Sequence, residues 1–134
     1  MSKNELIQSL ELDSLMELFR ILSDKTRLRI IFLLYHKELC VCEMCDILEM
    51  PQPNVSRHLG KLRAGGFVKY YQNGQWVFYY LNSVPGQPVN QLLKDIIEKI
   101  FTYINSGVFP EVVEDVDKLQ QKEKLNEMCE RSNK

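Results

Sequence analysis

Two prolines, Pro51 and Pro53, stand two residues apart between two helical segments, and they constrain the fold more than any other feature. Proline lacks a backbone N–H and disfavours the helical conformation in the residue before it, so no helix runs through this point. We expect a short helix over about residues 42–48, a tight turn, and a second helix from Pro53 or Asn54 to Arg63. This order is that of a helix-turn-helix.

Two β-rich segments, residues 67–71 and 76–81, follow the second helix after Gly65-Gly66. Asn73-Gly74 lies between them, and this dipeptide between two such runs is a strong hairpin signal. A hairpin directly after a helix-turn-helix forms a wing. The expected fold class is therefore mainly α with a small β-hairpin, a winged helix-turn-helix.

Three further helices are expected, over residues 6–22, 25–36 and 89–106, and Ser23-Asp24 suits the start of the second of them. The apolar residues of 89–106 recur at helical spacing and exceed what two short helices and a hairpin cover. Together with the N-terminal helix they predict the symmetric interface of a homodimer.

The length of 134 residues suits one domain, which we place at residues 1–107, followed by an acidic tail at 108–134 that is either helical or partly disordered. No apolar run approaches the roughly 20 residues of a membrane helix, and the N-terminus does not read as a secretory signal. We therefore expect a cytoplasmic protein with no membrane partner.

Acidic residues are absent from residues 50–94, although the chain has 18 of them. The same segment holds five of the 17 Lys and Arg residues, so a polyanion would be drawn to it.

Within this segment, Val55, Leu59 and Leu62 form the apolar face of the second helix, and its other faces are rich in hydrogen-bond donors. Such a helix suits the major groove of double-stranded DNA. Arg57 is the candidate for guanine, Asn54 or Gln52 for adenine or phosphate, and His58 for either a phosphate contact or a structural hydrogen bond. The candidate DNA-binding residues are Gln52, Asn54, Ser56, Arg57, His58, Lys61 and Arg63.

Three cysteines, Cys40, Cys42 and Cys45, lie within six residues, and Cys129 is the fourth in the chain. In a cytosolic protein such a cluster indicates metal binding or reactivity rather than a disulfide framework. On an intact helix Cys42 and Cys45 lie about 60° apart, whereas Cys40 lies about 160° from Cys42. Three sulfurs therefore meet around one atom only if Cys40 precedes the helix or the first turn unwinds. The helix N-terminus is also expected to lower the thiol pKa.

Three soft sulfurs favour a thiophilic ion. Trivalent arsenic or antimony forms three bonds to sulfur, cadmium(II) and lead(II) remain alternatives, and zinc usually requires a fourth ligand. The Cys42–Cys45 pair also matches the C-x-x-C of thiol oxidoreductases, but there it follows a strand in a βαβ unit. We therefore expect neither an enzyme nor a constitutive cofactor.

Residues 22–29, 38–43 and 52–59, with Leu62 and Arg63, resemble the ArsR/SmtB family of winged-helix, homodimeric, metal-responsive repressors, and the resemblance covers about residues 12–104. The C-x-C-x-x-C pattern resembles that of the arsenic-responsive members, in which three thiols ligate As(III) or Sb(III). The resemblance implies that Cys40, Cys42 and Cys45 hold the inducer, that the apo dimer binds operator DNA, and that the metalloid releases it.

The sequence departs from other members of the family in three ways, two of which concern the inducer site and one the wing. The cadmium and lead sensors also draw on N-terminal cysteines, and residues 1–39 contain none. The zinc sensors bind metal through Asp and His on the last helix. Here Asp95 is present, but no His follows it in the sequence. The wing tip lacks the basic residues common in the family. A cadmium-, lead- or redox-responsive repressor of the same fold is the alternative function.

Overall fold

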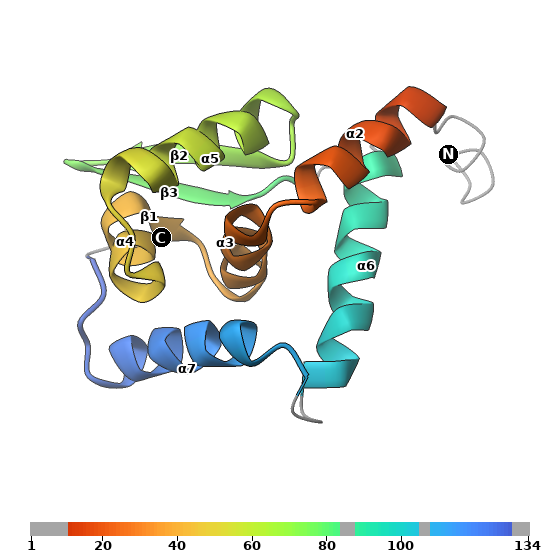
Figure 1. Ribbon diagram of the computed structural model, residues 1–134. Helices are drawn as coiled ribbons and strands as arrows, with labels where there is room; N and C mark the ends of the chain where they lie inside the picture. Colours follow the sequence, from red (N-terminus) through yellow and green to blue (C-terminus); the bar gives the residue numbers. More distant parts are fainter. Residues whose placement is uncertain (1–10, 84–87, 105–107, 130–134) are drawn as a thin grey trace.

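The computed structural model describes residues 11–83, 88–104 and 108–129, and α4, the turn after it and α5 form the expected helix-turn-helix (Figure 1). The hairpin of β2 and β3 follows as the wing. The mainly helical, winged fold class is thus confirmed. The helices are α2 (Leu12–Leu22), α3 (Lys25–His36), α4 (Val41–Leu48), α5 (Gln52–Ala64), α6 (Pro88–Ile104) and α7 (Pro110–Lys124), and the strands are β1 (Leu39–Cys40), β2 (Val68–Asn73) and β3 (Trp76–Leu81).

The turn between α4 and α5 depends on Glu49 and Pro51. Glu49 takes the left-handed conformation, with φ of 55°, and its N–H donates to the carbonyl of Cys45, which ends α4. Pro51 is the N-cap of α5, and its carbonyl accepts the N–H of Asn54 at 3.1 Å. The helix begins one residue before the expected start because proline is tolerated in the first turn, where its missing N–H has no partner to lose.

The sheet has the order β1-β3-β2 and is antiparallel throughout. Gly74, with φ of 62°, allows the tight turn of the hairpin, in which Asn73 pairs with Trp76. The sequence did not predict β1, because two residues cannot show an alternating pattern. In β1, Cys40 pairs with Phe78 of the wing, so the first clustered cysteine is part of the same sheet as the hairpin.

Helix α3 lies at the centre of the core, as its nearly uniform hydrophobicity predicts, with Ile30, Ile31 and Leu33 fully buried. The carboxylate of Asp24 caps it by accepting the N–H of Arg27 at 3.0 Å. In Figure 1, α5 and the hairpin lie on one side of α3 and α4, and α7 lies on the other. α2 crosses one end of α6.

The acidic tail forms a helix over Pro110–Lys124, and this helix shares the core. Val112 and Leu119 are buried, and the Arg29 guanidinium donates to both oxygens of Asp115 at 2.8 Å. Asp115 is 1% exposed, and its hydrogen bonds raise the pKa of Arg29. The domain division at residue 107 stays a prediction, but α7 is not detached from the fold.

Parts of the expected elements fall outside the described residues. The N-terminal helix, expected from residue 6, is described from Leu12 onward. The helix expected to end at residue 106 is described to Ile104, and the tail is described to Cys129.

The buried Arg29–Asp115 pair predicts the stability of α7. Asp115→Ala leaves a largely buried guanidinium without its carboxylate, and we expect a loss of about 3 kcal/mol in the free energy of unfolding, measured by urea denaturation. Glu111→Ala removes a partner of the exposed Lys25–Glu111 pair and serves as the control, with an expected loss below about 1 kcal/mol. Equal losses in the two variants would contradict this role of Asp115.

Candidate functional site

Helix α5 buries one face and exposes the other. Val55, Leu59 and Leu62 are at most 1% exposed and pack in the core. Six of the seven candidate DNA-binding residues are exposed, namely Gln52, Asn54, Ser56, Arg57, Lys61 and Arg63. The structure thus leaves on the surface an uninterrupted face of donors and positive charge in a stretch of sequence that carries no carboxylate.

His58, the seventh candidate, is buried at 7% exposure. Its Nδ1 lies 3.4 Å from Nη1 of Arg27 and 3.9 Å from the Asp24 carboxylate. Burial lowers the pKa of His58, which keeps the imidazole uncharged at neutral pH. This placement favours the structural alternative for His58, and a contact with DNA stays a prediction.

Arg27 of α3 connects α2 to α5, and sequence reasoning did not single it out for this role. Its guanidinium donates to the carbonyls of Ile21 at 2.8 Å and Arg20 at 3.3 Å, at the C-terminal end of α2. It also contacts His58 of α5. The orientation of α5 relative to α2 therefore depends on one buried arginine.

The wing is held to α5 by its aromatic residues. The Arg63 guanidinium lies 4.6 Å from the ring centroid of Tyr70, a cation–π contact. Tyr71 stacks on Phe78 across the hairpin, with centroids 5.4 Å apart. These contacts pack aromatic residues of the wing within the sheet and against α5.

The clustered thiols lie at the N-terminus of α4, the helix whose other end leads through the turn to α5. Cys40 is the N-cap residue, in the extended conformation with ψ of 166°, and Cys42 lies in the first turn. Of the two arrangements that the sequence allowed, the structure has the one with Cys40 outside the helix. The Sγ atoms of Cys40 and Cys42 are 2.9 Å apart.

The third sulfur at this place belongs to Cys129, not to Cys45. The Cys129 Sγ lies 3.2 Å from that of Cys40 and 3.1 Å from that of Cys42, and all three lie within 4.8 Å of one another. Cys45 does not belong to this group. It is half-buried and packs against the hydrophobic core.

Glu43 brings Cys129 to the cluster. One oxygen of its carboxylate accepts the N–H of Cys40 at 3.0 Å, and the other accepts the N–H of Cys129 at 2.8 Å. The carboxylate is 2% exposed, so both hydrogen bonds are shielded from water. A charge-assisted bond of this kind is about twice as strong as a neutral one. Glu43 is therefore a positioning residue for two of the three cysteines.

The expected lowering of the thiol pKa is wrong for Cys40 and Cys45. Burial raises the pKa of Cys40 far above its usual value, and the neighbouring Cys42 adds to this. Burial and a hydrogen bond with Cys42 raise the pKa of Cys129 to about 11. Burial also raises the pKa of Cys45. The cost of desolvating a thiolate outweighs the helix N-terminus here.

The donor set fits a soft, three-coordinate ion. Three sulfurs converge, and neither an imidazole nor a carboxylate oxygen belongs to their group among the described residues. Thiolates select thiophilic ions, whereas structural zinc takes four ligands.

Sequence reasoning missed Cys129 and Glu43 as parts of this cluster. Cys129 is 87 residues from Cys42 along the chain, so no spacing could link them. Glu43 carried a weak signal, since an acidic residue three positions after a helix N-cap is the capping-box pattern.

Comparison with known proteins agrees with this geometry. Residues 24–70 match the family model "Bacterial regulatory protein, arsR family". The arsenic resistance transcriptional regulators ArsR1 and ArsR2 of Pseudomonas putida are each 42% identical to this chain, over 60% and 58% of it and 63% and 69% of their own lengths. The arsenical resistance operon repressor of Escherichia coli is 48% identical over 49% of this chain and 57% of its own length. The chain thus spans about three fifths of the length of ArsR1 and of the Escherichia coli repressor.

A solved structure agrees on the fold. The homodimeric winged helix-turn-helix DNA-binding domain of Mb0332 from Mycobacterium bovis superposes with a TM-score of 0.55, over 77% of this chain and 93% of that one. Its sequence identity of 20% supports the fold alone. Within the described residues, no helix combines the length and hydrophobicity needed to cross a membrane.

Proposed function

This chain belongs to the arsR family of bacterial regulatory proteins, and on that premise we propose that it is a homodimeric transcriptional repressor, released from operator DNA when As(III) or Sb(III) binds its clustered thiols. The observation that carries the proposal is the contact of three sulfurs at the start of α4, the helix that directly precedes α5 and its exposed donors. The protein acts in the cytoplasm and needs no catalytic activity or constitutive cofactor.

DNA recognition is assigned to the exposed face of α5. Arg57 and Asn54 stand near its N-terminal end, where the recognition helix of this fold approaches base edges. Lys61 and Arg63 lie in its last turns and contact phosphates, which position the protein without reading sequence.

Dimerisation is assigned to α2 and α6. Leu12, Met16 and Phe19, at positions i, i+4 and i+7 of α2, are 71%, 51% and 55% exposed. Half-buried apolar residues of α6 add to this surface, among them Ile96 and Ile100. A second copy of the chain covers this face, and its α5 then reaches the next half-site, about 34 Å along the duplex.

The coupling between thiols and DNA runs through two direct connections. Cys42 lies in the first turn of α4, whose other end leads through the turn at Pro51 to α5. Cys40 pairs with Phe78 of β3, which belongs to the wing. Cysteines drawn toward one centre shift α4 and β1 together. A coupling free energy of about 1–3 kcal/mol corresponds to a 5- to 150-fold loss of DNA affinity.

Cys40 and Cys42 are the ligands on which the proposal depends, and Cys45 as the third ligand stays a prediction from the sequence pattern. Sulfur–sulfur contacts of 2.9–3.2 Å also suit oxidation, so a redox-responsive repressor is the second candidate. Cadmium(II) and lead(II) are alternative inducers for the same thiols.

Arsenite titration tests the inducer. The reduced protein is bound to a fluorescent duplex selected by the protein from a random pool, and arsenite is expected to lower the anisotropy. Cys40→Ser and Cys42→Ser remove sulfur ligands and are expected to retain DNA binding while losing the response. A response to cadmium(II), lead(II) or peroxide but not to arsenite would contradict the metalloid assignment, as would wild-type release in both variants.

The Arg57 side chain is expected to contribute direct base contacts. Arg57→Ala should weaken binding to the selected duplex by about 1–3 kcal/mol and relax its preference at one base pair. Lys124→Ala, which removes a cation from the exposed end of α7, is the control and should bind as the wild type does. Unchanged affinity in Arg57→Ala would mean that α5 does not read the duplex through this residue.

The exposed face of α2 predicts the oligomeric state. Phe19→Glu places a charge in the proposed interface, and sedimentation should shift from dimer toward monomer with unchanged helical circular dichroism. Leu125→Glu changes a comparably exposed apolar residue, 65% exposed, beyond the end of α7 and should remain dimeric. Dimers of equal strength in both variants would rule out this interface.

A further inference from the structure

We propose that Cys129 supplies the third sulfur of the inducer site, so that a bound metalloid holds the segment after α7 against the start of α4. This inference rests on the function proposed above and assigns the ligand that Cys45 would otherwise provide. It makes the C-terminal segment part of the sensor.

The geometry of the three sulfurs suits a single three-coordinate ion. Their separations of 2.9, 3.1 and 3.2 Å are nearly equal, so the three atoms stand at the corners of a regular triangle. A three-coordinate ion needs such a set of equivalent donors. Cys40, Cys42 and Cys45, the set that the sequence pattern suggests, do not form a group of this kind.

The backbone also holds Cys129 in place, independently of its sulfur. Asn126 takes the left-handed conformation, with φ of 57°, and reverses the chain after α7. The N–H of Glu127 then donates to the carbonyl of Lys122 at 2.8 Å, and the N–H of Cys129 donates to Glu43. The same buried carboxylate holds Cys40, so one side chain sets the positions of two ligands.

Cys45 and Cys129 differ in what each would require to bind the inducer. To join Cys40 and Cys42, the Cys45 sulfur has to leave its packing against the core. Cys129 already lies beside both sulfurs.

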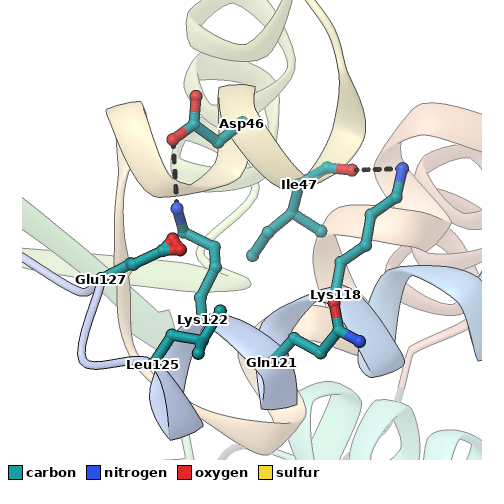
Figure 2. A pocket seen from close by; sticks show the side chains of 7 residues that line it. All are labelled: Asp46, Ile47, Lys118, Gln121, Lys122, Leu125 and Glu127. Atoms are coloured by element: carbon teal, nitrogen blue, oxygen red, sulfur yellow. Dashed lines mark hydrogen bonds and ion pairs between the residues drawn. The ribbon is translucent and has the colours of Figure 1, made fainter.

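Figure 2 shows the polar contacts between α4 and the end of α7, from which this segment continues. Lys122 pairs with Asp46 at 3.1 Å, and Lys118 reaches the Ile47 carbonyl at 3.5 Å, across a cavity of about 230 Å³. The Asp46 side chain is 71% exposed and that of Lys122 is 18% exposed, and an ion pair open to water on one side contributes little to stability. These contacts between α4 and the end of α7 are polar and weak, whereas the Arg29–Asp115 pair anchors α7 further along.

Closure and binding are then linked. A ligand that binds the closed arrangement better than the open one stabilises the closed arrangement by the same free energy, because the coupling is reciprocal. The inducer is therefore expected to protect the segment after Lys124, and the segment to raise the affinity for the inducer.

Thiol mapping of the unmodified chain tests the assignment. The reduced protein is incubated with arsenite, treated with N-ethylmaleimide, digested and analysed by mass spectrometry. Cys40, Cys42 and Cys129 are expected to be protected and Cys45 to be labelled. Protection of Cys45 with labelling of Cys129 would overturn the inference and leave the proposed function standing. Labelling of all four cysteines would overturn both.

A matched pair of variants gives the second readout. Replacing a residue that only hydrogen-bonds to a metal ligand costs about 10- to 100-fold in metal affinity. Cys129→Ser removes a direct ligand, so its dissociation constant for arsenite should rise at least about tenfold. Cys45→Ser, its control, should stay within about twofold of the wild type. Arsenite should slow proteolysis after Lys124 in Cys45→Ser but not in Cys129→Ser. The reverse pattern, or equal losses in both variants, would contradict a site made of Cys40, Cys42 and Cys129.

Discussion

The Glu43 carboxylate is the contact on which the arrangement of this protein depends most. It is almost completely buried, and its two oxygens accept the backbone N–H groups of Cys40 and Cys129. A buried carboxylate is stable only when hydrogen-bond donors satisfy its oxygens. Glu43 therefore requires the two N–H donors that it contacts. One side chain in the first turn of α4 thereby fixes the start of the helix-turn-helix and the end of the described chain at the same place.

From this place the structure extends in three directions. Through β1, the cluster joins the sheet of the wing, and through α4 and its proline turn it joins α5. Through the segment that ends at Cys129 it joins α7, which is anchored on α3 by Arg29 and Asp115. A change at the thiols therefore reaches the wing and α5, to which DNA contact is assigned, and it does so through short, contiguous contacts rather than through a long path.

The sequence predicts most of the fold because its signals are local. The prolines at 51 and 53, the Asn73-Gly74 turn and the Asp24 cap each determine backbone conformation within a few residues, and the structure has the expected element at each place. The inward and outward faces of α5 follow from helical spacing in the same way. His58 shows the limit, because its burial depends on Arg27, which comes from α3 and is 31 residues away along the chain.

The candidate thiol site could be predicted only in part for the same reason. Cys40 and Cys42 are neighbours in sequence and in space, and their contact was predictable up to the question of where α4 begins. Cys45 shares the sequence pattern but packs against the core. Cys129 has no pattern at all, since its position results from the packing of α7 and the reversal at Asn126. Spacing predicts a ligand set only where the chain between the ligands is short.

X-ray absorption at the arsenic edge tests the central claim most directly, because it counts the sulfur neighbours of the bound ion without reference to DNA. We expect three sulfur neighbours around arsenic in the arsenite-loaded wild type. In Cys129→Ser we expect two, with a lighter atom in the third position. Three sulfur neighbours in Cys129→Ser would contradict it and would assign the third ligand to Cys45.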